Sequence, residues 1–598
     1  MTKTTACALD CYDACRIVVQ EGTTQIKGDS THPSGNGALC TLLNKSIHEE
    51  ERIKTPRING KSVSMEEAMH AVKKAFEAPS SLLWRGSGNV GVMQEVTNLF
   101  MQRVGGTLTH GTLCDGAGDA GIVEGRGVNR TLPLEQVAKA ETVVVWGRNV
   151  TVTNAHMMPF LEGKNIVVID PVKTAIAKKA DMHLQIQPRT DYYLAIMLSR
   201  FIYMEDSQDT KWLERFAPDY EDFYEFTQEH RIKSILQYIG TDLGEIGHML
   251  NYLRNQKVVF IVGAGVQKYS TGASTLHAID SLAALLGLFG KEGCGVHYLG
   301  DSKLGFDNPF DVSCKTVSKV VTPFSDFDTV LVQGGNPAES MPDTLRVCAS
   351  LEAVENLIYF GLYENETSKR AKIVIPAKNF FEKEDVRLSY GHHYVQKINQ
   401  AVQSDTGISE YDFTKWLFDA FGFDGLWSEE SYIDAWLKQC KEDAHGYTSV
   451  AYEEIPYADG FGEDGDDEFV FIDDYDDDFI NTKRFTKVRT SKKNRVEDER
   501  FWLLSPKSSK SLNTQFKRDN KVQIHPGHGY EEGSVLRLSS EHGKLELEVK
   551  HNADLRHDCL MVTNNTLGIN RLTPSIISDE GESACYQEVK IEIEKAEG

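Results

Sequence analysis

The sequence predicts an α/β protein of several domains that ends in a β-barrel. Its 598 residues exceed what one hydrophobic core usually holds, so more than one core is expected. Apolar runs at 142–146, 258–263 and 329–333 each lead into a glycine turn, and helical segments lie between them. This alternation is typical of doubly wound parallel sheets. After residue 500, short alternating runs separated by turn residues predict the barrel.

Four of the eleven cysteines lie in the first forty residues, as Cys7-x3-Cys11-x3-Cys15-x24-Cys40. Three thiolates on one short loop and a fourth from a later segment can hold a [4Fe–4S] cluster, whose irons need ligands from several directions. A predicted hairpin at 16–28 and a glycine-rich loop lie between the third and fourth cysteines. A zinc knuckle, which usually has Cys-x2-Cys pairs, and chance cysteines on a helix face remain alternatives from the spacing.

The charge and hydrophobicity of the sequence argue against nucleic-acid binding and against membrane insertion. The formal net charge of −24 argues against nucleic acid, because phosphate binding draws on an excess of Lys and Arg. The sequence contains no run of eighteen apolar residues, and its start lacks a signal-peptide stretch and a twin-arginine motif. Because the cysteine spacing suits ligands better than disulfides, we expect a cytoplasmic protein without direct membrane insertion.

A second candidate site surrounds Cys114, which lies in a stretch of small residues at 111–121. Glycine lets the backbone approach a ligand closely, as in many cofactor loops. A lone cysteine is otherwise more often inert packing. The adjacent Asp115 has two interpretations: it caps the helix that begins near Gly116, or it moves protons if burial raises its pKa toward neutrality.

The runs at 142–146 and 166–169, with a helix at 153–161 between them, predict a βαβ unit that binds ligands at the carboxyl ends of its strands. Asp170 follows the second run, where an acidic residue commonly binds ribose hydroxyls or a guanine edge. The first turn has no Gly-x-Gly-x-x-Gly motif, so a nicotinamide site is disfavoured. The run at 329–333 begins a second unit of this kind, and two units suit two halves of a cofactor.

The cysteine motif, with Gly28-Asp29 and His32-Pro33 before its last member, resembles the N-terminus of the molybdopterin oxidoreductases, the dimethyl sulfoxide reductase superfamily. Members bind molybdenum or tungsten through a bis(molybdopterin guanine dinucleotide) cofactor. The likeness covers nearly the whole chain. It implies that a thiolate completes the coordination of Mo or W, and that a cluster is bound nearby. The metal ligands implied are Cys114 for Mo or W, and Cys7, Cys11, Cys15 and Cys40 for the [4Fe–4S] cluster.

The resemblance also assigns residues around the cofactor. A family lysine lies between cluster and pterin shortly after the fourth cysteine, and Lys45 is the candidate here. Formate dehydrogenases of the family carry histidine after the metal ligand, whereas this chain has Asp115, which weakens formate as the substrate. The residues implied to bind the pterin nucleotides are Gly147, Asn149, Asp170, Asp191, Gly335, Asn336, Thr367, Asn564, Asn570 and Asp579.

Two residues depart from the family pattern. Arg189 stands where members have glycine, and it would either add a phosphate contact or obstruct the turn. Lys372 stands where members usually carry aspartate. The asparagines assigned above, Asn336 before a proline among them, are also ordinary turn formers.

Residues 452–478 contain thirteen Asp or Glu and no Lys or Arg. Because like charges repel, the segment is predicted to be a solvated linker. Aromatic side chains interleave the acidic ones, and they would alternatively let the segment dock on a basic redox partner or on its own protein. These aromatic residues are Phe461, Phe469, Phe471, Tyr475 and Phe479.

The sequence thus divides into five predicted parts. They are a [4Fe–4S] domain at 1–57, an α/β domain at 58–140 and 325–445 with the second pterin nucleotide, a Rossmann-like domain at 141–324 with the first, an acidic linker at 446–500, and a barrel at 501–598.

As the resemblance implies, we expect a catalytic subunit that performs two-electron oxo, sulfido or hydride transfer on a small substrate. The cluster would pass electrons singly to an iron–sulfur subunit or a ferredoxin-like carrier. The alternative is a noncatalytic electron-transfer or assembly subunit that has lost the metal, which Arg189, Lys372 and the position of Lys45 motivate. A nonredox hydratase is a third possibility. No motif fixes the substrate, the choice of Mo or W, or the oligomeric state.

Overall fold

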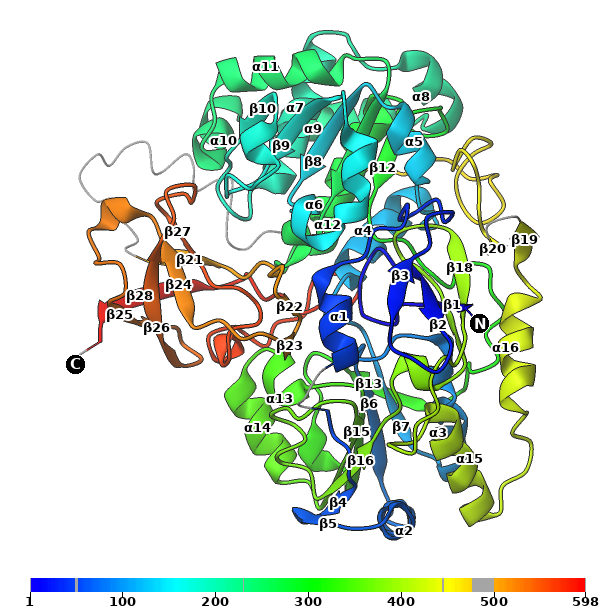
Figure 1. The fold of residues 1–598 in the computed structure, drawn as a ribbon. Coiled ribbons are helices and arrows are strands. Elements are labelled where there is room, and N and C mark those ends of the chain that lie inside the picture. The colour runs from blue at the N-terminus through cyan, green and yellow to red at the C-terminus, as the bar shows by residue number, and fades with distance from the viewer. Residues whose placement is uncertain (1, 49–51, 230, 444–445, 476–499, 597–598) are drawn as a thin grey trace.

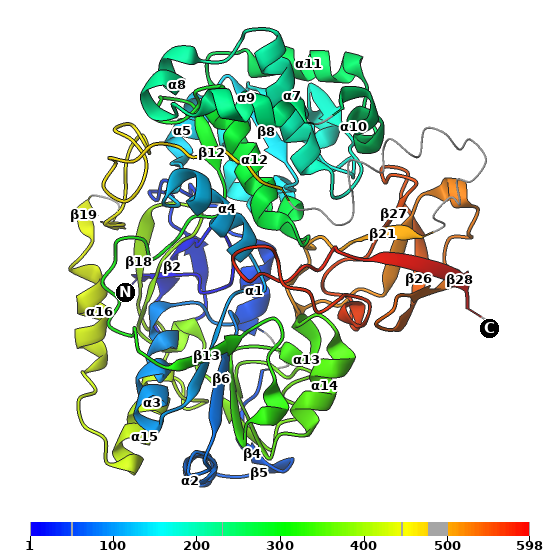
Figure 2. The same ribbon diagram turned by 180° about the vertical axis from the view of Figure 1, so that it is seen from behind.

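Two α/β units, a cysteine-bearing N-terminal segment and a barrel make up the molecule (Figure 1). The computed structural model describes residues 2–48, 52–229, 231–443, 446–475 and 500–596. One α/β unit lies at the top of Figure 1 and the other at the bottom, with the N-terminal strands between them. Figure 2 shows, from behind, that long loops of the barrel reach back to α4 and β13 in the middle of the molecule.

The N-terminal segment forms a small antiparallel sheet that carries the first cysteines. Its strands, in the order β1-β2-β3, are β1 (Thr2–Ala6), β2 (Arg16–Gln20) and β3 (Ile26–Gly28). The predicted hairpin is confirmed by the pairing of β2 with β3. Helix α1 (Thr41–His48) begins directly after Cys40.

The upper unit is a parallel five-stranded sheet with the order β10-β9-β8-β11-β12. Its strands are β8 (Thr142–Trp146), β9 (Asn165–Ile169), β10 (Met182–Leu184), β11 (Val258–Val262) and β12 (Gly295–His297). Its helices include α7 (Asp191–Met204), α8 (Thr210–Phe216), α9 (Tyr220–Gln228), α10 (Ile232–Ile239), α11 (Leu243–Leu253) and α12 (Gly272–Leu285). The predicted parallel strands are confirmed, and their apolar composition follows from burial on both faces.

The crossover between β8 and β9 differs from the prediction of one helix at 153–161. It consists of the short helix α6 (Val150–Thr153) and the 3-10 helix η2 (Ala155–Leu161). Pro159 lies inside η2 and has no backbone N–H to donate. A regular α-helix would lose a hydrogen bond at this position, so the tighter and shorter form is observed.

The lower unit is an eight-stranded mixed sheet with the order β13-β7-β6-β14-β15-β16-β4-β5. Its strands are β4 (Arg57–Ile58), β5 (Lys61–Ser62), β6 (Ser81–Arg85), β7 (Thr107–His110), β13 (Lys315–Ser318), β14 (Thr329–Gln333), β15 (Asn356–Gly361) and β16 (Ile373–Pro376). Its helices include α2 (Met65–Ala75), α3 (Thr97–Val104), α13 (Pro337–Ser340), α14 (Thr344–Glu352) and α15 (Glu410–Phe421). Strand β13 lies inside the range predicted for the Rossmann-like domain, yet it pairs with β7 in this lower sheet.

A second small sheet lies beside the N-terminal one. Its strands, in the order β17-β18-β20-β19, are β17 (Asp385–Arg387), β18 (Tyr394–Ile398), β19 (Lys441–Asp443) and β20 (Gly446–Thr448). Helix α16 (Glu429–Leu437) packs near β17. Strand β18 lies against β1, so side chains from residues 385–398 can reach the cysteine loop.

The C-terminal region is a closed six-stranded barrel, as predicted. Its strands are β21 (Phe501–Leu504), β24 (Lys521–Ile524), β25 (Val535–Ser539), β26 (Lys544–His551), β27 (Cys559–Met561) and β28 (Lys590–Lys595). Leu503, Val522, Leu536 and Val549 are among the fully buried residues that fill it. The hairpin β22 (Ser511–Leu512) and β23 (Gln515–Phe516) extends from the barrel toward the N-terminal segment (Figure 1).

Residues 446–475 of the acidic segment are part of the folded body, unlike the solvated linker that the charge predicts. Phe461, Phe469 and Phe471 are buried in the core of the upper unit. Tyr475 stacks on Tyr192 of α7 with a centroid distance of 3.5 Å. The burial of these rings stabilises the segment despite its charge. Phe479 and the rest of the predicted linker up to residue 499 lie outside the described residues.

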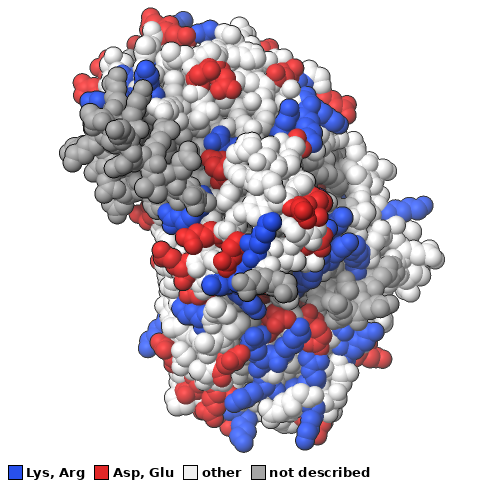
Figure 3. All heavy atoms as spheres, turned by 90° about the vertical axis from the view of Figure 1, so that its left-hand side faces the viewer, with Lys and Arg blue, Asp and Glu red and all other residues white. Residues whose placement is uncertain are grey.

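The surface charge is patterned locally. On the face shown in Figure 3, Lys and Arg side chains gather over the lower half, although the chain as a whole carries a net charge of −24. The net charge therefore does not give the sign of each face. Among the described residues, no helix is both long enough and apolar enough to cross a membrane.

Candidate functional site at the strand ends

The carboxyl ends of the parallel strands of the lower sheet meet at one edge, and several chemically active residues follow them. Strand β7 leads into the loop that carries Cys114. Its neighbours β13 and β6 end immediately before Lys319 and at Arg85. Strand β14 leads into Gly335 and Asn336. Ligands of open α/β sheets bind at such an edge, so this is the candidate active site.

The loop of Cys114 is fixed by segments distant in sequence. The Cys114 N–H donates to Thr112 Oγ1 at 2.9 Å, and Thr112 itself pairs with residues 583–584 of a barrel loop. The Cys114 carbonyl accepts hydrogen bonds from Gln267 Nε2, at 2.6 Å, and from Lys268 Nζ. The thiol itself is accessible to solvent. The backbone is thus held rigidly while the sulfur is left available.

The glycines around Cys114 let other segments of the chain pack closely against this loop and its helix. A Cβ at Gly116 would overlap the Gly581 carbonyl, one at Gly118 the Tyr298 hydroxyl, and one at Gly121 the Ala273 carbonyl of α12. The interpretation that these small residues leave space for a ligand is therefore wrong at these three positions. Helix α4 (Gly116–Arg126) instead packs closely on α12 and on the barrel loop.

Charged side chains gather around the Cys114 thiol. Although solvent reaches it, the dense protein around the thiol raises its pKa to about 11, and Asp115 adds to this shift. Lys268 and Lys507 lower the pKa of the thiol. Burial raises the pKa of Asp115 as well. Asp115 occupies the N-cap position of α4, but its side chain makes no capping hydrogen bond there, so the capping interpretation is not supported.

Several buried polar atoms near strand ends and in barrel loops have no protein hydrogen-bond partner. Buried polar groups are nearly always paired in native proteins, so a bound polar ligand would be expected where several are not. Among the unpartnered atoms of the described residues are Trp84 Nε1, Arg85 Nε, Tyr298 OH and Ser318 Oγ near strand ends, and Asn564 Oδ1, Asn565 Oδ1 and Ser583 Oγ in barrel loops. These residues fit a large polar cofactor.

The predicted cluster ligands lie together in the N-terminal segment. The Cys7 N–H donates to the Cys15 carbonyl at 2.9 Å. Burial raises the pKa of Cys7 to about 12, and the nearby Cys40 thiolate raises it further. Burial and the other three cysteines also raise the pKa of Cys15. Adjacent buried thiolates need positive metal to be stable, so the donor set fits an iron–sulfur cluster. No group of three or more His, Cys, Asp or Glu in the described part of the chain is arranged for a single metal ion.

Arg387, which sequence reasoning missed, holds the cysteine loop. Its guanidinium is 2% exposed and donates to the carbonyls of Cys7 at 3.2 Å, Leu9 at 3.3 Å and Cys11 at 3.0 Å. Further donors to this loop are Ser389 Oγ to Tyr12 O, His392 Nε2 to Asp13 O, and Gln396 Nε2 to Ala14 O. Residues 387–396 thus bind the loop's carbonyl groups. No local motif marks them, because they lie almost 400 positions later in the chain.

Asp10 connects the cysteine loop to the Cys114 edge. Its carboxylate accepts hydrogen bonds from Ser87 Oγ at 2.7 Å, Asn513 Nδ2 at 3.1 Å and Tyr390 OH at 3.2 Å. The charge of Asp10 raises the pKa of Cys114, so the two candidate centres are neighbours.

Lys45 lies exposed on α1, and its Nζ donates to the Lys510 carbonyl of the barrel at 3.4 Å. Lys507, a lysine of the C-terminal region, is acted on by the charges of both candidate centres: although burial lowers its pKa, Asp10, Cys114 and Cys11 together raise it. Lys507 is therefore a second candidate, besides Lys45, for the lysine that the resemblance places between cluster and pterin.

The residues predicted to bind the first nucleotide meet at the carboxyl edge of the upper sheet. Gly147, in the left-handed region at φ +58°, donates to the Ile169 carbonyl at 2.8 Å. Asp170 Oδ1 accepts from the Val172 N–H at 2.8 Å, and Asp191 Oδ1 accepts from Trp146 Nε1 at 2.7 Å.

Burial raises the pKa of Asp170 to about 7 and that of Asp191 to about 6. The charge of Asp191 adds to the shift of Asp170, so these two carboxylates lie close together. Asn149, at the start of α6, accepts from the Thr151 hydroxyl at 2.7 Å.

Arg189 fits its turn and contacts the barrel. It adopts the left-handed conformation, φ +70°, that glycine would adopt there. Its Nε pairs with Glu588 Oε1 at 2.8 Å, with side chains only 3% and 5% exposed. Nη2 also donates to Ser270 Oγ at 3.1 Å. The arginine that replaces the family's glycine is therefore held by an ion pair with the C-terminal region.

The residues predicted for the second nucleotide bind one another. Asn336 Oδ1 accepts from the N–H and the hydroxyl of Thr367 at 3.2 and 3.0 Å, and its amide donates to Glu339 at 2.8 Å. Gly335 lies against the ring of Trp84. The side chains of Asn336 and Thr367 are buried and engaged, so only the backbone at this turn is left for a ligand.

The predicted barrel residues have different surroundings. Asn570 Nδ2 donates to the Glu339 carbonyl at 2.8 Å. Asp579 accepts from the N–H groups of Ala273 and Ser274 at the start of α12, each at 3.0 Å. Of the three, Asn564 has a buried side-chain oxygen without a partner among the described residues, and it remains the best candidate for a cofactor contact.

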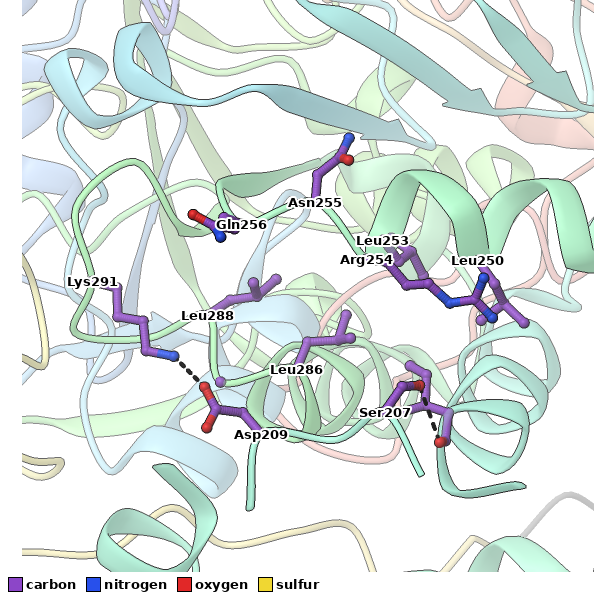
Figure 4. A pocket seen from close by; sticks show the side chains of 12 residues that line it. Ser207, Asp209, Leu250, Leu253, Arg254, Asn255, Gln256, Leu286, Leu288 and Lys291 are labelled. Carbon is purple, nitrogen blue, oxygen red and sulfur yellow. Dashed lines mark hydrogen bonds and ion pairs between the residues drawn. The ribbon is translucent and has the colours of Figure 1, made fainter. Parts of the chain in front are cut away.

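A cavity of about 350 Å³ lies elsewhere, at the amino end of β11 in the upper unit (Figure 4). Asn255 and Gln256 line it just before that strand, and Leu286 and Leu288 line it after α12. The ammonium of Lys291, which also lines the cavity, is paired with Asp209. The cavity therefore lies at the end of the upper sheet opposite the carboxyl edge that carries Gly147 and Asp170, and the charged groups Arg254, Lys291 and Asp209 that line it already have partners.

Comparisons with known proteins agree with this geometry. The molybdopterin oxidoreductase family profile matches residues 52–408. The chain is 26% identical over 515 residues to the probable oxidoreductase YyaE of Bacillus subtilis, covering 76% of this chain and 75% of that protein. It is 23% identical to the F420-dependent formate dehydrogenase 1 subunit alpha of Methanococcus maripaludis, covering 75% and 74%. Acetylene hydratase from Pelobacter acetylenicus has a similar fold, with a TM-score of 0.78 at 13% identity over 99% of this chain and 100% of that one. Because the profile spans more than half of its length, the chain belongs to the molybdopterin oxidoreductase family.

Proposed function

We propose that this protein is the catalytic subunit of a molybdopterin oxidoreductase that acts on a small substrate beside Cys114. The observation that carries this proposal is the position of Asp10, which lies in the cysteine loop and acts electrostatically on Cys114. It supports an electron path from the strand edge to a [4Fe–4S] cluster bound by Cys7, Cys11, Cys15 and Cys40.

The cofactor proposed is Mo or W with two pterin guanine dinucleotides. When bound, it supplies two-electron oxo, sulfido or hydride chemistry that protein side chains alone do not provide. Cys114 would supply a soft thiolate ligand, which suits a metal already surrounded by sulfur. Asp170 and Asp191 would bind one nucleotide at the upper sheet, with Gly147 and Asn149 in the turn beside them. The backbone of Gly335 and Asn336, with Thr367 holding that turn, and the side chains of Asn564, Asn570 and Asp579 stay candidates for the other.

The protein's own task would be to position the substrate and to move protons. Asp115 directly follows Cys114, and burial raises its pKa, so it can hold a proton at a pH where an exposed aspartate cannot. Lys268 holds the backbone of the loop through the carbonyls of Leu113 and Cys114. This fixes the direction in which the thiol points.

Electrons would leave one at a time from the cluster to an iron–sulfur subunit or a ferredoxin-like carrier. The family relatives support such a partner, since one of them is named as a subunit of a larger dehydrogenase. We propose a cytoplasmic location because the spacing of the first four cysteines suits metal ligands better than disulfides.

A viologen-linked screen tests the proposal. Formate, nitrate, thiosulfate, polysulfide and an organic N-oxide are assayed with oxidised and reduced dye on anaerobically purified protein. We expect turnover of at least one compound in wild-type protein, and none in Cys114→Ala with the fold retained by circular dichroism. Turnover by Cys114→Ala equal to that of wild type would contradict the proposed metal ligand.

Two other functions have distinct outcomes. A noncatalytic subunit would contain iron without Mo or W. A hydratase would convert an alkyne such as acetylene without any electron acceptor. The full-length likeness to acetylene hydratase concerns the fold alone, so it favours neither reaction.

A further inference from the structure

An unpaired cation stands at the strand edge beside Cys114. Lys319 directly follows β13, and its N–H donates to the His110 carbonyl at the end of β7, at 2.8 Å. The same strand β7 leads into the Cys114 loop. The topology therefore brings the side chain of Lys319 to the loop from the neighbouring strand.

The Lys319 ammonium has an aromatic face but no anion. It lies 5.2 Å from the centroid of the Trp84 ring. Among the described residues it has no hydrogen bond or ion pair. Burial and the charge of Arg85 lower the pKa of Lys319 to about 8, although Asp10 and Cys114 oppose the shift. A cation held in this way is stabilised when an anion binds next to it.

The other charges at this edge leave an excess of cations. Arg85 forms no ion pair in the described structure, and its buried Nε has no partner. Lys268 is engaged with carbonyl groups, which leave its charge uncompensated. Asp10 is a carboxylate that acts on Lys319, and it accepts hydrogen bonds from three neutral donors.

We propose that Lys319, supported by Arg85, binds the anionic group of the substrate that reacts beside Cys114. The substrate is then a small oxyanion or carboxylate, and not a neutral N-oxide, S-oxide or alkyne. This inference rests on the proposed function and narrows its substrate class. The Trp84 ring positions the ammonium through a cation–π contact at 5.2 Å.

The phosphates of the cofactor are the other source of such an anion, and the test separates the two. Holoenzyme is prepared as wild type, Lys319→Met and Lys315→Met. Lys315 begins the same strand at its opposite end and is exposed, so its loss removes the same charge away from the site. Binding of nitrate, formate and azide is measured by calorimetry, and metal and guanine nucleotide are quantified in each preparation.

We expect at least one of these anions to bind wild type and Lys315→Met equally, and Lys319→Met about tenfold more weakly, as for loss of one charged hydrogen bond. All three preparations should contain the same amount of metal and nucleotide. Equal affinity in Lys319→Met, or no binding of any probe to wild type, overturns the inference. Loss of nucleotide from Lys319→Met with unchanged anion affinity assigns the lysine to the cofactor and also overturns it. Absence of Mo and W from the wild-type protein contradicts the proposed function. The anion affinities of the variants test the role of Lys319 alone.

Discussion

Arg189, in the region predicted to bind the first nucleotide, combines a strained backbone that destabilises the fold with a buried ion pair that stabilises it. Replacing this residue separates the two effects. The backbone there is left-handed at φ +70°, which disfavours any side chain with a Cβ. The side chain forms a buried pair with Glu588 that joins this turn to the barrel. Arg189→Gly removes both the strain and the pair, whereas Arg189→Ala removes the pair and keeps the strain.

The magnitudes follow from the geometry. Removing one partner of a buried ion pair typically costs about 3–5 kcal/mol, because the remaining charge is left uncompensated. Here Glu588 Oε2 still accepts from Ser270 N–H and Oγ at 2.8 and 2.9 Å, so the lower value is expected. Relief of the left-handed conformation by glycine returns about 1 kcal/mol. Arg189→Gly should therefore lose about 2 kcal/mol and Arg189→Ala about 3 kcal/mol.

The assay is thermal unfolding of the cofactor-free proteins, with Glu588→Gln and the double variant Arg189→Gly/Glu588→Gln included. We expect the midpoint to fall in the order wild type, double variant, Arg189→Gly, Arg189→Ala, because the double variant has no uncompensated charge. Equal midpoints for the glycine and alanine variants would refute the strain. A double variant no more stable than Arg189→Gly would refute the ion pair.

Other variants test the loop, the carboxylates and the helix contact. Arg387→Leu removes a charged donor from three carbonyls of the cysteine loop, so we expect loss of most bound iron, and normal iron content would contradict the holding role. In cofactor-free protein, Asp191 has a pKa of about 6 against about 3.9 unfolded, so the folded state binds its proton more tightly and the free energy of unfolding falls as pH rises from about 4 to 6. Asp170, with a pKa of about 7, adds a further fall of the same sign, so Asp191→Asn should reduce the total fall by up to about 3 kcal/mol at pH 8, and an unchanged pH profile would contradict the shift. Gly118→Ala overlaps the Tyr298 hydroxyl and should cost about 1–3 kcal/mol, partly restored by Tyr298→Phe, and no restoration would contradict the contact.

Elements with a strong local pattern were predictable from the sequence. The apolar runs that become β8, β11 and β14 are confirmed as parallel strands, because burial on both faces requires continuous apolar residues. The strands of the C-terminal barrel follow from alternation and turn residues. The two strand-like runs at 16–28 correctly predicted a hairpin between the third and fourth cysteines.

Features set by tertiary contacts were not predictable. The many acidic residues at 446–475 led to the prediction of a solvated linker. In the structure, Phe461 and Phe469 of this segment are buried in the core of the upper unit. Arg387 contacts the carbonyl of Cys7, which lies 380 positions earlier in the chain, and Lys319 follows a strand that pairs with the distant β7. The engagement of Asn336 with Thr367 also depends on packing, which a motif does not reveal.

The central claim is that one chain holds a [4Fe–4S] cluster at its N-terminal cysteines and Mo or W beside Cys114. Metal and pterin analysis of anaerobically purified protein, with electron paramagnetic resonance after dithionite reduction, tests it most directly. We predict about four irons per chain, near-stoichiometric Mo or W, two pterins and the signal of a reduced cluster. Iron without Mo or W, or a colourless protein without any signal, would contradict the account.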